Sequence, residues 1–221
     1  MKKLAAFIFD MDGVIIDSEP IHSRVKMDTF AHFGLEFDER DLIKYMGRTS
    51  GAIFGDVLAK SGRTDLAVSD VVAYKHSHYL EVLRSGCIQP VAGTVELIRA
   101  LNEKNIPVAL ATSSAKKVVE TVIEIFKLEN AFKSVISGWE LPKSKPDPAI
   151  YLLTAERLGV DAASCIVLED TENGLHAAKG AGMYAIGYKN KNSGAQDLSL
   201  ADMVVKNISD IKIDDLDNLL P

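Results

Sequence analysis

Two aspartates stand two residues apart directly after the first apolar run of the chain. Residues 4–9 are rich in β-forming side chains without polar alternation, which predicts a strand buried on both faces of a parallel sheet. The run ends at Asp10 and Asp12, and Gly13 then allows a tight turn. Carboxylates this close repel each other and need a divalent cation or a shared proton, unless they are solvated aspartates of an Asx-turn. At the end of a buried strand, the pair lies where open α/β sheets bind ligands.

Hydroxyl groups follow a second predicted strand. Residues 108–111 form another buried apolar run, and Thr112 and Ser113 lead from it towards a helix. A hydroxyl and the backbone N–H groups at a helix N-terminus can bind an anion. Threonine and serine also cap helices for structural reasons alone, so this stretch indicates a site only in combination with the aspartate pair.

A lysine and two further carboxylates complete the set. Lys145 precedes Pro146, which favours an extended backbone, and its compact ammonium is a good partner for phosphate. Glu169 and Asp170 follow a third buried run, residues 165–168. The alternatives are a solvated lysine and an acidic first turn of a helix. Parallel strands place all these ends at one sheet edge, where hard oxygen ligands suit Mg²⁺.

The elements that must position these residues fall into two blocks. No strand pattern interrupts residues 18–84, where helices are expected at 16–33, 39–45, 51–61 and 69–83. After a linker at 85–93, strands alternate with helices, which predicts a parallel sheet in an α/β fold. The expected strands are 108–111, 134–136, 165–168, 184–186 and 203–205, and the expected helices are 94–103, 116–126, 149–158 and 174–179.

Composition limits the classes of protein. The 221 residues suffice for a sizeable core with a small insert, and the net charge of −6 argues against general affinity for nucleic acid or anionic membranes. No apolar run is long enough to predict a membrane span. Asp10 and Asp12 interrupt the apolar N-terminal run too early for a signal peptide. Cys87 and Cys165 lack metal-ligand spacing and are expected to be free thiols in a reducing cytoplasm.

Residues 10–20, Asp-Met-Asp-Gly-Val-Ile-Ile-Asp-Ser-Glu-Pro, resemble the first motif of the haloacid-dehalogenase-like (HAD) superfamily. The resemblance is strongest to the branch that holds β-phosphoglucomutase and small sugar-phosphate phosphatases. Three later motifs follow in the right order, at Thr112, at Lys145 and at Glu169-Asp170. The resemblance implies a Rossmann-like doubly wound parallel sheet core, residues 1–16 and 87–221, with an inserted helical-bundle cap domain, residues 17–86.

The same resemblance implies a role for each motif residue. Asp10 is expected to be the nucleophile that forms an aspartyl-phosphate, and Asp12 the general acid and base. The residues implied to contact the phosphoryl oxygens are Lys145, Thr112, Ser113 and Ser114. Mg²⁺ is the implied cofactor, held by Asp10, Asp170, Glu169 and Asp12, the last through its backbone carbonyl.

Three residues of the expected cap are further candidates. In the family a histidine at the place of His22 couples cap closure to the general acid and base. Lys75 aligns with a cap lysine of the mutases, and Arg48 is the nearest candidate for their cap arginine, although its register is shifted. Arg48 and Lys75 could equally be plain surface charges.

The function expected from these residues is a Mg²⁺-dependent phosphatase acting on a small phosphorylated metabolite, with a sugar phosphate as the expected substrate class. The alternative is β-phosphoglucomutase; Ser-Glu-Pro after Asp17 favours the phosphatases, and Lys75 favours the mutases. Asp12 argues against dehalogenation, whose leaving group needs no proton. An inactive binding module would have lost at least one of Asp10, Asp12, Lys145 and Asp170. A cytoplasmic monomer is expected, and the sequence does not identify the substrate.

Overall fold

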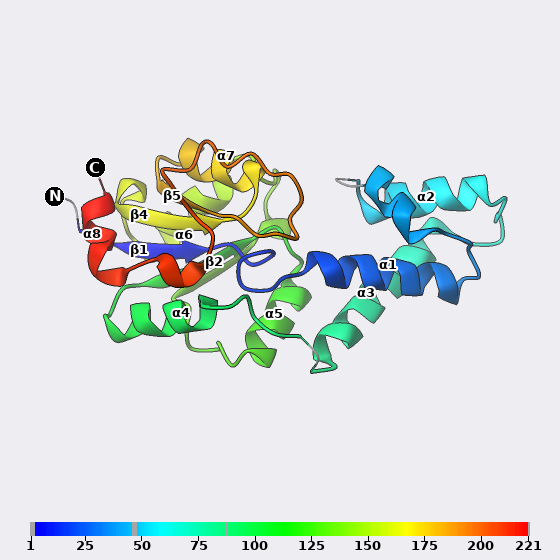
Figure 1. Ribbon diagram of the computed structural model, residues 1–221, viewed down its shortest axis with the longest axis horizontal. Coiled ribbons are helices and arrows are strands. Elements are labelled where there is room, and N and C mark those ends of the chain that lie inside the picture. Colours follow the sequence, from blue (N-terminus) through cyan, green and yellow to red (C-terminus); the bar gives the residue numbers. More distant parts are fainter. Residues whose placement is uncertain (1–2, 46–47, 87, 221) are drawn as a thin grey trace. The chain divides into compact units, whose positions relative to one another are not determined.

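A computed structural model describes residues 3–45, 48–86 and 88–220. The chain divides into two compact units: Met1–Asp17 together with Ile88–Pro221, and Ser18–Cys87 (Figure 1). We call them the α/β unit and the helical unit. Cys165 is a buried free thiol, whereas the prediction for Cys87 lies outside the described residues.

The α/β unit is built on a parallel sheet of six strands in the order β3-β2-β1-β4-β5-β6. The strands are β1 (Ala6–Phe9), β2 (Val108–Thr112), β3 (Ser134–Ser137), β4 (Cys165–Glu169), β5 (Tyr184–Tyr188) and β6 (Met203–Val205). Chain order reverses beside β1, which is where sheets of this kind form a ligand crevice. Phe9 pairs with Leu110 and Leu168, so Asp10 comes level with the carboxyl ends of both neighbouring strands.

Helices cover both faces of this sheet. Figure 1 shows α7 (Glu172–Gly180) on one side of the strands and α4 (Thr94–Glu103) with α5 (Lys116–Ile125) on the other. The remaining helices are α6 (Ala149–Leu158), α8 (Leu216–Leu219) and four single 3₁₀ turns: η2 (Gly138–Glu140), η3 (Ala162–Ser164), η4 (Ile208–Asp210) and η5 (Ile213–Asp215). Because helices cover both faces, β1, β2 and β4 are buried throughout, as their unbroken apolar runs predict.

The helical unit contains α1 (Glu19–His32), the 3₁₀ helix η1 (Glu39–Tyr45), α2 (Ser50–Lys60) and α3 (Val68–Arg84). Phe30, Phe54 and Val71 lie in its apolar core, and the two phenylalanine rings meet edge to face at 5.3 Å. None of the described helices is long and apolar enough to span a membrane.

The expected start of the first helix is wrong by three residues. The helix predicted to begin at Ile16 begins at Glu19 instead. Ile16 is fully buried and forms isolated β-bridges with Asp12 and Pro90, so at this position the chain still packs within the α/β unit. Ser18 lies at the helix N-cap but makes no side-chain capping hydrogen bond with the described residues, and Pro20 lies in the first turn, where its missing N–H has no helical partner to lose.

Candidate active site

A buried lysine joins the ends of three neighbouring strands. Lys145 lies between β3 and α6, and its Nζ donates to Asp10 Oδ1 at 2.6 Å and to Glu169 Oε1 at 2.6 Å. It also donates to the carbonyl oxygen of Ala111, at 3.1 Å. The lysine side chain is only 7% exposed, so these contacts are shielded from water. One ammonium therefore binds the ends of β1, β2 and β4.

Burial and the attraction between Lys145 and the carboxylates dominate the electrostatics of this group. Burial raises the pKa of Asp10 well above its ordinary value; Lys145 opposes the shift, while Glu169 and Asp170 add to it. Burial alone would lower the pKa of Lys145, but Asp10 and Glu169 hold it well above its ordinary value. The lysine therefore stays charged, and its single positive charge is shared among several buried carboxyl groups.

The carboxyl group of Asp12 faces hydroxyl groups rather than the other acids. Ser114 Oγ donates to Asp12 Oδ2 at 2.6 Å, and Thr112 Oγ1 lies 3.5 Å from the same oxygen. Ser114 is itself fixed, since its backbone N–H donates to Thr112 Oγ1 at 3.0 Å. Asp12 Oδ1 is buried and has no partner among the described residues. Ser113, by contrast, is exposed.

Three acidic residues form a group with the spacing of a cation site. One carboxylate oxygen from each of Asp10, Glu169 and Asp170 lies within 4.8 Å of the others. Burial, with repulsion from Glu169, raises the pKa of Asp170 to about 7. Asp170 Oδ1 is buried without a partner among the described residues. Gly13 makes room for this carboxylate, because a Cβ there would lie 1.9 Å from Asp170 Oδ2.

The carboxylate of Glu169 is already saturated with partners. Besides Lys145, it accepts from the hydroxyl of Tyr151 at 2.7 Å, from the hydroxyl of Thr171 at 3.0 Å and from the backbone of Asp170 at 3.1 Å. These bonds favour a role in holding Lys145 over a role as metal ligand. Tyr151 carries no signal in the sequence, since it lies within the apolar face of α6.

Two of the predicted residues of the helical unit lie together. His22 Nδ1 is 3.4 Å from Lys75 Nζ, and the His22 ring stacks on Tyr79 at 4.3 Å. Burial, with repulsion from Lys75, lowers the pKa of His22 to about 3, so the imidazole is neutral in ordinary buffers. Lys75 is buried, with 5% of its surface exposed.

Arg48 does not join that pair. Its guanidinium donates to the carbonyl oxygen of Ala52 at 3.1 Å and lies 3.7 Å from a carboxylate oxygen of Asp56. The same group lies 5.2 Å from the centre of the Tyr45 ring. Among the described residues, the partners of Arg48 therefore lie in α2 and at the end of η1.

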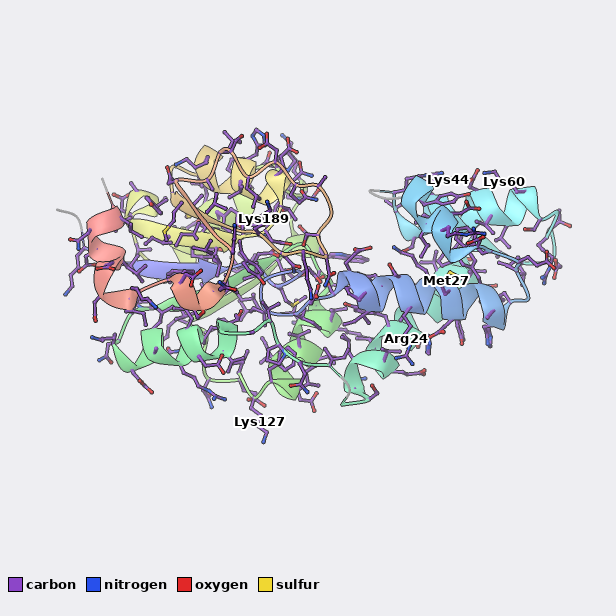
Figure 2. All side chains as sticks on the ribbon, in the orientation of Figure 1. Arg24, Met27, Lys44, Lys60, Lys127 and Lys189 are labelled. Carbon is purple, nitrogen blue, oxygen red and sulfur yellow. The ribbon has the colours of Figure 1, made fainter. Side chains whose placement is uncertain are left out.

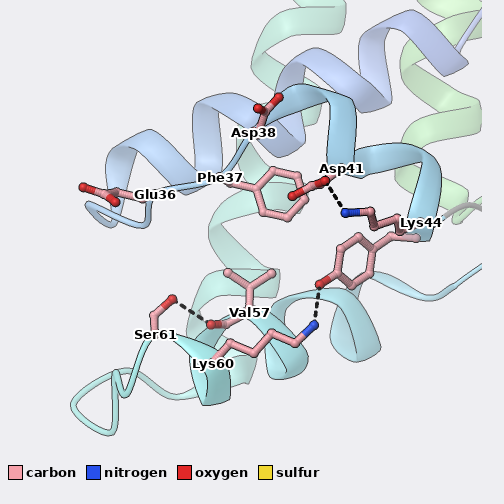
Figure 3. A pocket seen from close by; sticks show the side chains of 9 residues that line it. Glu36, Phe37, Asp38, Asp41, Lys44, Val57, Lys60 and Ser61 are labelled. Atoms are coloured by element: carbon pink, nitrogen blue, oxygen red, sulfur yellow. Dashed lines mark hydrogen bonds and ion pairs between the residues drawn. The ribbon is translucent and has the colours of Figure 1, made fainter.

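The helical unit also has an open cavity of about 770 Å³ with acidic and basic residues in its walls (Figure 3). Lys44 Nζ donates to Asp41 at 2.6 Å, and Lys60 Nζ donates to Asp56 at 2.9 Å. Because each of these lysines already has a carboxylate partner, the cavity has the charge balance of a solvated surface recess rather than of a phosphate site.

The fold thus gathers most of the predicted site residues at one sheet edge. A doubly wound parallel sheet with a buried lysine and buried carboxylates at the ends of its central strands defines an α/β enzyme. The family model described as haloacid dehalogenase-like hydrolase matches residues 7–188. The chain belongs to this family.

Individual relatives agree with the assignment. Hexitol phosphatase B of Escherichia coli (strain K12) is 32% identical over 187 residues, which cover 84% of this chain and 83% of that protein. Fructose-1-phosphate phosphatase YqaB of the same strain is 28% identical over 185 residues, covering 84% of this chain and 96% of that protein. These relatives confirm the predicted family and the predicted enzyme class, phosphoric monoester hydrolase.

A solved structure agrees as well. The crystal structure of a CbbY mutant from Rhodobacter sphaeroides, in complex with xylulose-(1,5)bisphosphate, has a TM-score of 0.81 to this chain at 26% identity. The match covers 97% of this chain and 99% of that chain. The predicted α/β fold with a parallel sheet is confirmed.

Proposed function

We propose that this chain is a Mg²⁺-dependent phosphatase that hydrolyses a small phosphorylated sugar through an aspartyl-phosphate on Asp10. The observation that carries the proposal is the arrangement around Asp10, which lies at the end of the central strand with Lys145 2.6 Å from its Oδ1. The relatives named hexitol phosphatase and fructose-1-phosphate phosphatase support the sugar-phosphate class.

Two aspartates divide the chemistry. Asp10 attacks phosphorus in line, and the bond to the sugar oxygen breaks. Asp12 donates a proton to that leaving oxygen and then accepts one from the water that hydrolyses the aspartyl-phosphate. Ser114 and Thr112 hold the Asp12 carboxyl group through Oδ2, which leaves Oδ1 for proton transfer.

Lys145 and the nearby hydroxyl groups stabilise the negative charge of Asp10 and of the phosphoryl oxygens. Lys145 offsets the repulsion between Asp10 and an incoming phosphate, and Glu169 keeps Lys145 charged and in place. Thr112 and the N-terminal end of α5, with Ser113 and Ser114, offer donors to the phosphoryl oxygens.

The acidic group fits a divalent cation. Asp10 and Asp170 would hold Mg²⁺, together with the backbone carbonyl of Asp12, and Asp170 Oδ1, which has no partner in the described part of the chain, supports this assignment. The bound ion would neutralise the charge that phosphate and carboxylate bring together. Glu169 is a less suitable ligand because its oxygens already accept hydrogen bonds.

We assign the helical unit as a cap, with its connections near residues 17–18 and 88–93 as hinges, and we propose a cytoplasmic monomer. Closure of the cap would exclude water and add contacts to the sugar. The pair formed by half-buried His22 and buried Lys75 is the part of this unit best suited to such contacts. The second candidate function is a phosphoglucomutase, because Lys75 aligns with a cap lysine of the mutases.

The test is a phosphate-release screen with Mg²⁺ over hexitol phosphates, ketose 1-phosphates and pentulose bisphosphates. A coupled assay follows conversion of β-glucose 1-phosphate to glucose 6-phosphate in parallel. Asp10→Asn should lower kcat by more than about 1,000-fold, whereas Lys143→Ala, an exposed lysine near the site, should leave it unchanged. Undiminished turnover by Asp10→Asn contradicts the nucleophile assignment, and mutase turnover far above phosphate release replaces the phosphatase by the mutase.

A further inference from the structure

A loop that the sequence marks only as polar reaches into the candidate active site. The segment begins at Lys189, labelled in Figure 2, directly after β5. Asn190 is 7% exposed, and its side-chain N–H donates to the carbonyl oxygen of Gly13 at 2.8 Å. Gly13 lies in the tight turn that follows the aspartate pair, with φ of +80°. The loop therefore holds the backbone of that turn from outside the motif.

Two further side chains of this loop bind carboxylates of the α/β unit. The Ser193 hydroxyl donates to Oδ2 of Asp170. The side-chain amide of Asn192 donates to Oδ2 of Asp17, the last residue before the chain enters the helical unit. Each bond joins residues more than 20 positions apart in sequence, so the contacts exist only because of the fold.

Hydrogen bonds within the loop and to the start of α7 hold the loop in place. Asn190 Oδ1 accepts from the backbone N–H of Asn192 at 2.8 Å. Gln196 donates to the carbonyl oxygen of Ser193 at 2.8 Å and accepts from the backbone N–H of Glu172, at the start of α7, at 3.1 Å. Residues 190–196, which we call the clasp loop, are thus connected at several points to the elements that surround the site.

The bond from Ser193 decides which oxygen of Asp170 is left free. Oδ2 is occupied by the serine hydroxyl and lies on the side where Gly13 lacks a Cβ. Oδ1 is buried without a partner among the described residues. Outer hydrogen bonds of this kind fix the rotamer of a ligating carboxylate, and their loss commonly lowers metal affinity 10–100-fold.

We propose that Ser193 is a positioning residue for the divalent cation, and that Asn190 supports it by fixing the Gly13 turn. The inference rests on the proposed function, since it takes Asp170 as a metal ligand. Ser193 acts through Asp170 and touches neither substrate nor reacting atoms. Its removal should therefore weaken cation binding far more than it slows the chemistry at saturating metal.

The test measures cation binding directly, without turnover. Metal-free wild type, Ser193→Ala, Ser193→Thr and Asp170→Asn are titrated with Mg²⁺ by calorimetry and with Mn²⁺ by electron paramagnetic resonance. Ser193→Ala should raise Kd by about 10–100-fold, and Ser193→Thr, which keeps the hydroxyl, should restore most of the affinity. Ser199→Ala, an exposed serine just beyond the clasp loop, is the matched control and should bind like wild type.

Activity then separates positioning from general damage. With Ser193→Ala, the metal concentration for half-maximal turnover should rise in step with Kd, while kcat at saturating metal stays within about threefold of wild type. The Tm of the metal-free variant should match that of wild type. If Ser193→Ala and wild type bind the cations with equal affinity, this inference alone is overturned. If wild type binds neither Mg²⁺ nor Mn²⁺, and so does not differ from Asp170→Asn, the proposed metal chemistry is overturned as well.

Discussion

The two units of this protein position polar side chains in different ways. In the α/β unit, Asp10, Lys145 and Glu169 come from three separate segments and meet at 2.6 Å, because parallel strands end at one edge of the sheet. In the helical unit, Arg48 is held by Asp56 and Ala52, while His22 and Lys75 form a separate pair. A sheet forces distant residues to converge, whereas helix faces need further packing to do so. Substitutions in the α/β unit should therefore have the larger effects.

The largest effect is expected from Lys145→Met. This change removes the cation between Asp10 and Glu169 and leaves two carboxyl groups buried without it, which costs about 3–5 kcal/mol when a buried pair is broken. Phosphatase kcat should fall at least about 1,000-fold. Lys75→Met, at the buried lysine of the helical unit, should lower kcat much less. Urea unfolding and steady-state kinetics check both variants, and equal effects of the two would remove the contrast between the units.

Two glycines with positive φ give a matched second comparison. A methyl group at Gly13 would meet the Asp170 carboxylate at 1.9 Å, whereas no atom of the described residues lies within 4 Å of a methyl group at Gly34 in the helical unit. Both positions carry the backbone cost of an L residue at positive φ, about 1–2 kcal/mol. Gly13→Ala should therefore lose more stability than Gly34→Ala and should also lose cation binding. Thermal unfolding and calorimetry with Mg²⁺ test this; unchanged cation binding in Gly13→Ala would contradict it.

Acid should destabilise the protein through His22. Its pKa falls from the ordinary value of 6.5 to about 3 in the folded protein, because burial and Lys75 disfavour the charged ring. Between those values the unfolded chain binds one more proton at this site than the folded chain does, so the free energy of unfolding decreases as pH falls. The decrease is at most about 1.4 kcal/mol per pH unit.

His22→Gln should remove this contribution, and the readout is the difference in slope between variant and wild type from pH 6.5 to 4.5. Urea unfolding at a series of pH values measures it. The comparison with wild type cancels other groups, including His78, whose pKa is raised by its bond to Asp28. Identical slopes would show that His22 is not buried in its neutral form.

The smallest effect is expected from Arg48→Ala. Its ion pair with Asp56 is long, at 3.7 Å, and partly exposed, and such pairs contribute about 0–1 kcal/mol. Stability should change by less than about 1 kcal/mol, and kcat/KM by less than about threefold. A loss of kcat/KM beyond 10-fold would instead place Arg48 among the substrate contacts. It would also reduce the difference between the effects of substitutions in the helical unit and in the α/β unit.

Regular patterns account for what could be predicted. The unbroken apolar runs ending at Asp10, Thr112 and Glu169 predict buried parallel strands, and parallel strands bring those ends together. The contact of Lys145 with two carboxylates, the hydroxyl of Tyr151 on Glu169 and the bond from Ser193 to Asp170 were not predictable. They depend on side-chain directions and on a loop without periodicity.

The sequence by itself determined which chemical groups end each central strand, because the type and spacing of residues along a strand need no partner to be recognised. It also determined that a helical segment is inserted after the first strand. Only the tertiary structure decided how the partners are shared. In the folded protein the Glu169 carboxylate accepts hydrogen bonds from Lys145 and Tyr151. Asp170 Oδ1 has no partner among the described residues, and Ser193 of the clasp loop donates to Asp170 Oδ2. The physical reason is that hydrogen bonds and burial depend on distances between residues far apart in the chain, and packing alone sets those distances.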